Sequence, residues 1–172
     1  MPLCGKSRDI AWLVEQGFMV VGAELSRIAV DALFQEMAVD AEVESTGPLT
    51  RCSGGGVEVF VGDIFDLSKP QLGSVDAVYD RAALVALPDE MRRRYALHIA
   101  DISARCPQLL LTFEYDQSTM NGPPFSVGPD AVAELYRASH TRREITRKAV
   151  EGGLKGRCAA DEVACLLTPL AL

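Results

Sequence analysis

The sequence predicts an α/β protein of three layers, in which helices cover both faces of a doubly wound, mostly parallel sheet. Three observations lead to this fold class. Short apolar runs, typical of buried strands, alternate with helical patterns, as in strand–helix–strand units. A glycine-bearing turn at residues 2–7 runs into the first helical pattern. Polar residues follow the expected strands, at the sheet edge where such folds bind their ligands.

The first half of the chain predicts two strands and two helices. They are expected at residues 19–25 and 57–61 for the strands, and at 6–16 and 27–37 for the helices. Ser26 is a suitable N-cap for the second helix, because its hydroxyl can accept a hydrogen bond from a free backbone N–H group. The residues expected to point inward from the two helices are apolar: Ile10, Trp12, Leu13, Val14, Ile28, Leu33, Phe34 and Met37. Glycines 54–56 are typical of a hairpin turn leading into strand 57–61.

The second half continues the alternation and then ends in two strands. The expected elements are strand 75–79, helix 88–104, strand 109–113, helix 129–139, and strands 144–150 and 162–167. The last two strands flank a glycine-containing link, which predicts a terminal antiparallel pair. The loop 114–128 is long and rich in Pro, Gly, Ser and Asn, and such loops in compact domains are usually functional or mobile.

Composition limits the class of protein. The 172 residues predict a single domain, 1–172, and the net charge of −7 makes nucleic acid an unexpected partner. The five cysteines are scattered and form no CxxC pair, so we expect reduced thiols and no metal site. No apolar run approaches the length of a membrane span. A soluble, cytoplasmic protein that does not bind membranes is therefore expected, and most simply a monomer.

The glycine turn and the strand after the first helix together predict a nucleotide crevice. Gly5 lets the backbone approach a ligand, and the following helix start offers free N–H groups. Glu24 ends the next strand, where a carboxylate can accept both hydroxyl groups of a ribose. The turn contains one glycine and not the three of a dinucleotide fingerprint. This pattern suits a ligand with a ribose and no phosphate, and S-adenosylmethionine is the commonest such ligand.

Five ordered motifs make the prediction more specific. They are Pro2-Leu3-Cys4-Gly5-Lys6-Ser7, Val21-Gly22-Ala23-Glu24-Leu25-Ser26, Gly62-Asp63-Ile64-Phe65-Asp66-Leu67, Tyr79-Asp80-Arg81-Ala82-Ala83-Leu84 and Gly122-Pro123-Pro124-Phe125. The set resembles the thiopurine S-methyltransferase family, particularly its bacterial members, from residue 2 to about residue 136 and more loosely to the end. The resemblance implies a Rossmann-like methyltransferase fold with S-adenosyl-L-methionine as the methyl donor.

The resemblance also implies roles on the donor side. Glu24 is expected to bind the ribose hydroxyls, or else to be a surface carboxylate at a strand end. Asp63 is expected near the adenine amino group, with Ile64 packing on the ring face; the alternative for Asp63 is a turn or capping aspartate. The Gly5 turn and Leu3 are expected beside the methionine moiety of the donor.

On the acceptor side the resemblance singles out Arg81 and Phe125. Arg81 is expected near the transferred methyl group, as a catalytic residue that contacts both the donor and the acceptor. An arginine there favours the thiolate form of the acceptor, which is the better nucleophile. The alternative for Arg81 is a structural pair with Asp80, which itself is expected either to orient Arg81 or to cap the turn. Phe125 is expected to stack on an aromatic thiol, or alternatively to lie in the core beside a rigid proline turn.

Family members carry a further segment ahead of the motif at residues 2–7, and this segment contains the apolar strand that feeds the turn. The domain is therefore expected to be N-terminally incomplete, with the first strand of the sheet missing. Strands 19–25 and 75–79 would then face a gap or pair with each other, because unpaired buried backbone groups are costly.

The favoured function is S-adenosylmethionine-dependent methyl transfer to the sulfur of small aromatic or heterocyclic thiols. One alternative is methylation of selenium or tellurium species, which are also soft nucleophiles. A second is a truncated, non-catalytic methyltransferase-like protein. A nicotinamide-dependent oxidoreductase is disfavoured, because the chain has no Gly-x-Gly-x-x-Gly motif.

Overall fold

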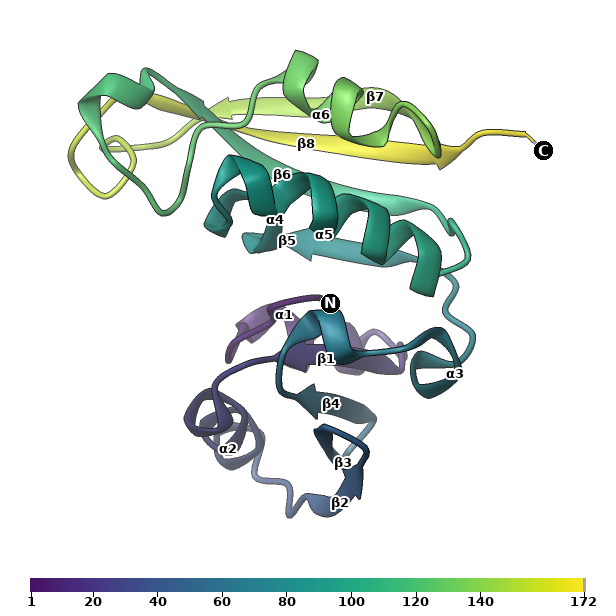
Figure 1. Cartoon of the computed structure of the whole chain (residues 1–172). Coiled ribbons are helices and arrows are strands. Elements are labelled where there is room, and N and C mark those ends of the chain that lie inside the picture. The colour runs from purple at the N-terminus through teal and green to yellow at the C-terminus, as the bar shows by residue number, and fades with distance from the viewer. Residues whose placement is uncertain (172) are drawn as a thin grey trace. The chain divides into compact units, whose positions relative to one another are not determined.

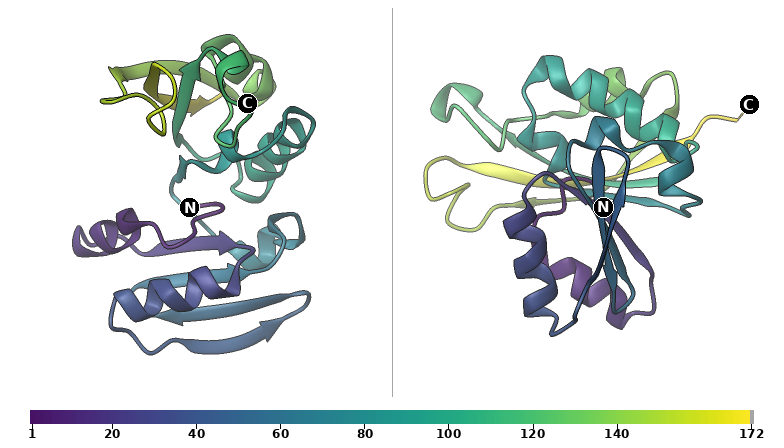
Figure 2. Two further views of the ribbon diagram at one scale, coloured as in Figure 1. Left: turned by 90° about the vertical axis from the view of Figure 1, so that its left-hand side faces the viewer. Right: turned by 60° about the horizontal axis from the view of Figure 1, so that its bottom comes forward.

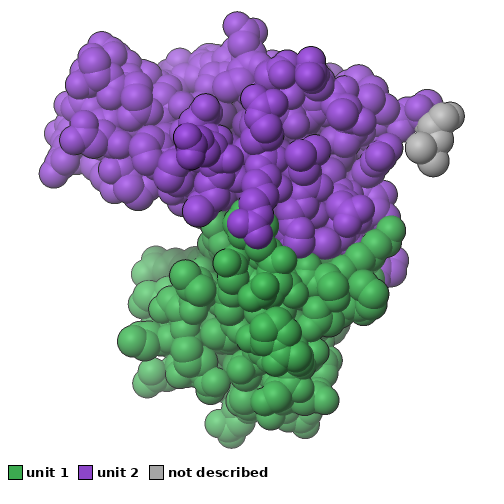
Figure 3. Space-filling view, in the orientation of Figure 1, with its two compact units in different colours: residues 1–73 green, residues 74–172 purple. Residues whose placement is uncertain are grey.

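The structure is a computed structural model that describes residues 1–171. It divides into two compact units, residues 1–73 and residues 74–172 (Figure 3). Each unit contains a four-stranded sheet of its own. The single domain expected over residues 1–172 stays a prediction.

The first unit is built on a mixed sheet with the strand order β1-β4-β3-β2 (Figure 1). Its strands are β1 (Val20–Glu24), β2 (Glu42–Thr46), β3 (Leu49–Gly54) and β4 (Val57–Val61). β1 and β4 are parallel, whereas β2, β3 and β4 form an antiparallel meander. The hairpin turn expected at residues 54–56 joins β3 to β4, with Gly54 opposite Val57. β2 and β3 occupy a polar stretch that carried no clear strand pattern.

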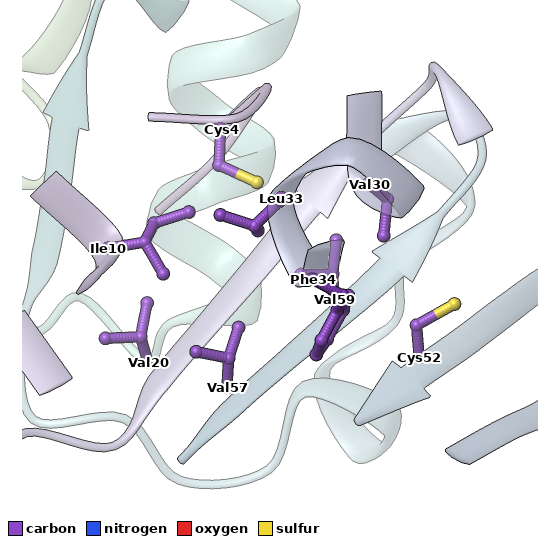
Figure 4. Packing of buried hydrophobic residues seen from close by; sticks show 9 residues of the cluster. All are labelled: Cys4, Ile10, Val20, Val30, Leu33, Phe34, Cys52, Val57 and Val59. Carbon is purple, nitrogen blue, oxygen red and sulfur yellow. The ribbon is translucent and has the colours of Figure 1, made fainter. Parts of the chain in front are cut away.

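Two helices cover this sheet, α1 (Arg8–Glu15) and α2 (Arg27–Glu36). Ser7 and Ser26 are the N-caps, and each side chain accepts a backbone N–H bond. One apolar cluster joins both helices to β1, β3 and β4 (Figure 4), and Figure 2 (left) shows α2 lying along the sheet. The prediction that Trp12 and Ile28 point into the core is wrong, because Trp12 is 57% exposed and Ile28 is 83% exposed. The unit ends with a 3₁₀ turn, η1 (Ile64–Asp66), and the short helix α3 (Lys69–Leu72).

The first residues of the chain pair with the edge of β1 that faces away from β4. The amino group of Met1 donates to the Val21 carbonyl at 2.7 Å, and Pro2 bridges to Ala23 in the parallel sense. Backbone N–H groups of Ala23 and Cys4 donate to the carbonyls of Met1 and Ala23. These bonds cover residues 21–23 of this edge through an isolated bridge, but no strand of residues 1–171 pairs with it, as expected for a missing first strand. Among the described strands β5 pairs with β6 alone, and β1 and β5 do not pair with each other.

The second unit contains a mixed sheet with the order β5-β6-β8-β7. Its strands are β5 (Val78–Arg81), β6 (Gln108–Tyr115), β7 (His140–Ala149) and β8 (Ala160–Pro169). β5 and β6 are parallel, and the terminal antiparallel pair β7–β8 is found as predicted. Among the strands of residues 1–171, β1–β4 and β5–β6 are the parallel pairs, so both sheets are mixed.

The described part of the second unit contains the α-helices α4 (Ala83–Ala86), α5 (Asp89–Ile102) and α6 (Pro129–Tyr136) and the 3₁₀ turn η2 (Gln117–Thr119). Figure 1 shows α5 and α6 in front of the strands of this sheet. The residues of β6 alternate accordingly, with Gln108, Leu110 and Thr112 buried and Leu109 exposed between them. Pro88 is the N-cap of α5, close to the predicted start. Within residues 1–171 no helix has the length and apolar character needed to cross a membrane.

Candidate active site

The turn at residues 2–7, called the donor turn below, adopts a backbone that leaves open space at its glycine. Leu3 and Gly5 have positive φ angles of 45° and 53°. A Cβ atom built on Gly5 meets no other atom within 4 Å. Positive φ is disfavoured for leucine, and such strained residues cluster at ligand sites. The donor turn therefore presents backbone to open space beside the start of α1.

Glu24 holds the donor turn against the end of β1. One carboxylate oxygen accepts the Gly5 N–H group at 2.8 Å, and the other accepts the Ser26 N–H group at 2.9 Å. Charge-assisted bonds of this kind are stronger than bonds between neutral groups. Glu24 is therefore more than a surface carboxylate: it joins the two backbone segments on either side of the predicted ribose site. Each oxygen keeps a further lone pair for a ligand.

Asp63 lies at the same sheet edge, because β4 runs parallel to β1. The Gly62 N–H group donates to the Glu24 carbonyl at 2.9 Å, which places the residues after both strands side by side. Asp63 is exposed, and one of its oxygens accepts the Phe65 N–H group at 3.0 Å and so caps η1. Ile64 is only 5% exposed, so most of its side chain is packed within the protein. The first unit thus brings Leu3, Gly5, Glu24 and Asp63 to one edge, and the buried Ile64 follows Asp63 at the start of η1.

In the second unit Arg81 is the last residue of β5, and its side chain is exposed. Ala82 follows with a left-handed φ of 70°, and α4 begins at the next residue. Asp80 is fully buried, accepting the Leu84 N–H group at 3.1 Å and the Tyr95 hydroxyl at 2.7 Å. Of its two expected roles, these bonds make Asp80 the cap of the turn into α4. Burial raises the pKa of its carboxyl group, although these hydrogen bonds oppose the shift.

Phe125 belongs to a loop at residues 116–128, called the acceptor loop below. The Phe125 N–H group donates to the Val85 carbonyl at 2.7 Å, so the loop is fixed to α4 just after Arg81. The Tyr115 hydroxyl donates to the Pro124 carbonyl at 2.7 Å. The peptide bonds Gly122–Pro123 and Pro123–Pro124 are cis. Phe125 is half-buried, so it is neither a core residue nor a freely exposed one.

Several residues that shape this region have no motif to reveal them. Tyr95 and Arg92 lie within an ordinary helical pattern, yet they reach Asp80 and Phe125 respectively. The Gln117 side chain accepts the Ser126 N–H group at 2.8 Å and donates to the Met120 carbonyl, which ties the two ends of the acceptor loop. A polar residue inside a Pro- and Gly-rich loop is the only sequence signal for Gln117.

Cys4 is buried in the donor turn, and burial raises the pKa of its thiol to about 11. A thiol with a raised pKa remains protonated near neutrality and reacts slowly with electrophiles. We therefore expect iodoacetamide at about pH 8 to label Cys4 much more slowly than the half-buried Cys158. Peptide mass mapping over time checks this expectation. Labelling of Cys4 at the rate of Cys158 would contradict it, and unfolding the protein is expected to abolish the difference.

No group of three or more His, Cys, Asp and Glu side chains among residues 1–171 is arranged to hold a metal ion.

Solved structures identify the fold. A methyltransferase from Methanosarcina mazei has a TM-score of 0.69 at 14% identity, over 99% of this chain and 91% of that chain. The glycopeptide N-methyltransferase MtfA, solved with S-adenosylmethionine, has a TM-score of 0.58 at 16% identity, over 95% of this chain and 78% of that chain. The fold is that of the Rossmann-like methyltransferases that depend on S-adenosylmethionine.

The family follows from the sequence. The thiopurine S-methyltransferase family profile matches residues 1–163, and the chain belongs to this family. Thiopurine S-methyltransferase of Xanthobacter autotrophicus is 55% identical over 167 residues, which are 97% of this chain and 78% of the relative. The Gluconobacter oxydans enzyme is 46% identical over 170 residues, or 99% of this chain and 77% of the relative.

The resemblance seen in the five motifs is thereby confirmed. The protein is a methyltransferase, and S-adenosylmethionine is its methyl donor. The open donor turn and the carboxylate at the end of β1 fit a donor that carries a ribose and a cationic sulfonium. Neither the selenium and tellurium alternative nor the non-catalytic alternative is favoured by these matches.

Proposed function

We propose that this enzyme methylates the sulfur of small aromatic or heterocyclic thiols, thiopurines among them. The observation that carries the proposal is the link through α4 between Arg81 and Phe125. Arg81 and Ala82 lead into α4, and the Val85 carbonyl of α4 accepts the Phe125 N–H group. An exposed cation and an aromatic ring are thus presented from one end of the second unit. This pair suits a thiolate on an aromatic ring, and the relatives' names support the same class of acceptor.

The reaction is an in-line displacement that needs no covalent enzyme intermediate. S-Adenosylmethionine supplies a methyl group on a positively charged sulfur. The bond from the methyl carbon to the donor sulfur breaks as the bond to the acceptor sulfur forms, and the thiol proton passes to solvent. The protein contributes by holding the two sulfur atoms in line and by excluding water. Arg81 lowers the pKa of the acceptor thiol, because a nearby cation favours the thiolate.

On the donor side we propose that Glu24 accepts the ribose hydroxyls through the lone pairs left by Gly5 and Ser26. We assign the second oxygen of Asp63 to the adenine amino group, since the described hydrogen bonds occupy only its first oxygen. Leu3 and Gly5 border the methionine moiety. Ile64 packs against the face of the adenine ring as part of the protein interior, because little of its side chain is exposed.

Replacing Arg81 tests the proposed function directly. Arg81→Met is expected to lower kcat/KM for a thiopurine by about 100-fold, which is typical for removing one charge-stabilising donor from an active site. Arg81→Lys keeps the charge and is expected to retain part of the activity. The deficit of Arg81→Met is expected to shrink at high pH, where the acceptor thiol ionises without help.

A methyl-transfer assay with radiolabelled donor, run across pH, measures both effects. Arg93→Met on the exposed side of α5 is the matched control and is expected to behave as the wild type. An Arg81→Met enzyme with wild-type kcat/KM would remove Arg81 from the mechanism. A wild-type enzyme that methylates no thiol, while binding the donor, would refute the proposed acceptor class.

We further propose that the enzyme acts in the cytoplasm as a monomer, on small molecules and not on nucleic acid or membranes. The net charge of −7 supports the exclusion of nucleic acid and membranes as partners, because an acidic protein repels polyanions and anionic lipid surfaces. Sedimentation analysis of the purified chain tests the monomer, and an acceptor screen that includes reduced selenium species tests the preference for sulfur.

A further inference from the structure

Arg92 of α5 is a buried cation with little electrostatic compensation. The residue is 7% exposed, yet its ion-pair partner is Asp89, whose side chain is 92% exposed and whose oxygen lies 3.5 Å away. Burial lowers the pKa of the Arg92 guanidinium. Arginine is rarely buried unless it is well paired, because removing its charge from water is costly. Packing alone does not require an arginine here, since methionine would fill a similar space at no such cost.

The contacts of Arg92 join two segments that flank the candidate acceptor region. Its Nε–H group donates to the Leu87 carbonyl at 2.8 Å, at the end of α4. The guanidinium carbon lies 5.4 Å from the centroid of the Phe125 ring. A guanidinium at this distance over a ring face is attracted by the ring quadrupole, more strongly when both groups are shielded from water. Arg92 therefore connects the turn between α4 and α5 to the side chain of Phe125.

The Phe125 ring also packs against the backbone of its own loop. A Cβ atom built on Gly122 would lie 2.6 Å from the Phe125 ring, so the ring packs directly on the Gly122 backbone. The hydrogen bond from the Phe125 N–H group to the Val85 carbonyl fixes the position of the Phe125 backbone but not the orientation of its ring. The Gly122 contact and the guanidinium together restrict the ring orientation.

We propose that Arg92 is a positioning residue that orients Phe125 for the acceptor. The inference rests on the proposed function, which assigns Phe125 to acceptor binding. Arg92 touches neither sulfur; it acts through the ring. The cation behind the ring also reduces the repulsion that the negative face of an aromatic ring exerts on an approaching thiolate. Loss of Arg92 is expected to affect acceptor binding more than donor binding or turnover.

Arg92→Met tests this inference, with Arg92→Lys and Arg93→Met beside it. Arg92→Met is expected to raise KM for an aromatic thiol by about fivefold to tenfold, the range of a partly desolvated cation–π contact. The donor affinity measured by calorimetry, and kcat, are expected to stay within about twofold of wild type, because the donor turn is not part of this cluster. Arg92→Lys keeps a cation and is expected to restore part of the affinity. Arg93→Met, on the exposed face of the same helix, is expected to change nothing.

Hydrogen exchange supplies a readout that does not depend on activity. The Phe125 amide is expected to exchange faster in Arg92→Met than in wild type, as the loop loosens around its bond to Val85. In a Phe125→Leu background, Arg92→Met is expected to have no further effect on KM, because the two residues act as a pair. If Arg92→Met does not fold, KM for the acceptor, the donor affinity and the exchange of the amide at position 125 are measured on Arg92→Lys and Phe125→Leu instead. These values then decide whether the inference stands.

The inference is overturned if Arg92→Met leaves KM for the acceptor unchanged, or if the donor affinity falls by the same factor. It is also overturned if the two substitutions are additive in KM. A wild-type protein that transfers no methyl group to any thiol refutes the proposed function instead. In that case the exchange rate of the Phe125 amide still shows whether Arg92 holds the acceptor loop against α4.

Discussion

Glu24→Ala is expected to weaken the binding of S-adenosylmethionine by at least tenfold, about 1.4 kcal/mol. The substitution removes the acceptor of the Gly5 and Ser26 N–H groups together with the predicted ribose contact. Hydrogen bonds to a charged group each contribute about 1.5–3 kcal/mol, so the loss of the proposed ribose bonds alone exceeds the tenfold threshold. The loss of the Gly5 and Ser26 bonds acts indirectly, by loosening the site before the donor binds. Calorimetric titration with the donor and with its demethylated product measures the loss.

Glu24→Gln shows how much of this loss comes from the geometry of the donor turn. A carboxylate accepts with both oxygens, whereas a carboxamide accepts with one oxygen and donates with its nitrogen. One of the two N–H groups, Gly5 or Ser26, would then face another donor. We therefore expect Glu24→Gln to lose most of the affinity that Glu24→Ala loses, despite its similar size.

Glu44→Ala is the matched control for both variants. Glu44 pairs with Arg51 on the surface of the same unit, its side chain is 69% exposed, and its strand β2 lies at the opposite end of the sheet from β1. Exposed pairs contribute little, so donor affinity is expected to remain at the wild-type level. Donor binding by Glu24→Ala that equals that of Glu44→Ala would show that the carboxylate at the end of β1 does not bind the donor.

The elements of the first unit were predictable where local signals and packing agree. Ser26 caps α2 as expected, and glycines at 54–56 form the predicted hairpin. The inward face of α2 was predicted less well. Val30, Leu33, Phe34 and Met37 form the continuous i, i+3, i+4, i+7 stripe that packs on the sheet. Ile28 falls outside this stripe and is exposed at the first turn of the helix.

The sequence predicted which residues of the candidate site end the strands. It did not predict which groups within the protein those residues bind. Arg81 and Glu24 follow apolar runs, so their positions at the carboxyl ends of strands follow from the parallel arrangement. The bond between Asp80 and Tyr95 links residues 15 positions apart, on a strand and a helix. No local periodicity encodes that contact, because it depends on how α5 docks onto β5. The same reason explains why Arg92 and Phe125 were not predicted to meet.

The bond between Asp80 and Tyr95 predicts the largest effect on stability. Both residues are 0% exposed, and the Tyr95 hydroxyl donates to the second carboxylate oxygen of Asp80 at 2.7 Å. Tyr95→Phe leaves that oxygen buried without its partner. A buried polar group that loses its hydrogen bond costs about 1–3 kcal/mol, and more when it is charged. Tyr95→Phe is therefore expected to lower the free energy of unfolding by about 2–3 kcal/mol at neutral pH.

Tyr136→Phe is a close control, because it makes the same chemical change at an equally buried position. The Tyr136 hydroxyl has no hydrogen-bond partner among residues 1–171, and the residue is 1% exposed. Removing an unpartnered buried hydroxyl is expected to be neutral or slightly stabilising. Urea unfolding of the two variants and the wild type measures the contrast. Equal losses in both variants would show that the bond to Asp80 contributes nothing specific.

The pH dependence of the stability loss in Tyr95→Phe shows whether the Asp80 carboxyl group causes that loss. Burial raises the pKa of Asp80 above its value in the unfolded chain, so the folded state binds the proton more tightly. The stability that this group contributes is present at low pH and is lost as pH rises from the ordinary carboxyl range through the raised pKa. The Tyr95 hydroxyl opposes that loss, because its bond stabilises the ionised form.

Removing the Tyr95 hydroxyl should therefore lower the stability most where Asp80 is ionised. Tyr95→Phe is expected to approach wild-type stability as the buffer is taken from neutral pH to a pH in the ordinary carboxyl range, where Asp80 takes up its proton. A deficit that is the same at both pH values would mean that the lost packing of the ring edge, and not the buried carboxylate, sets the cost.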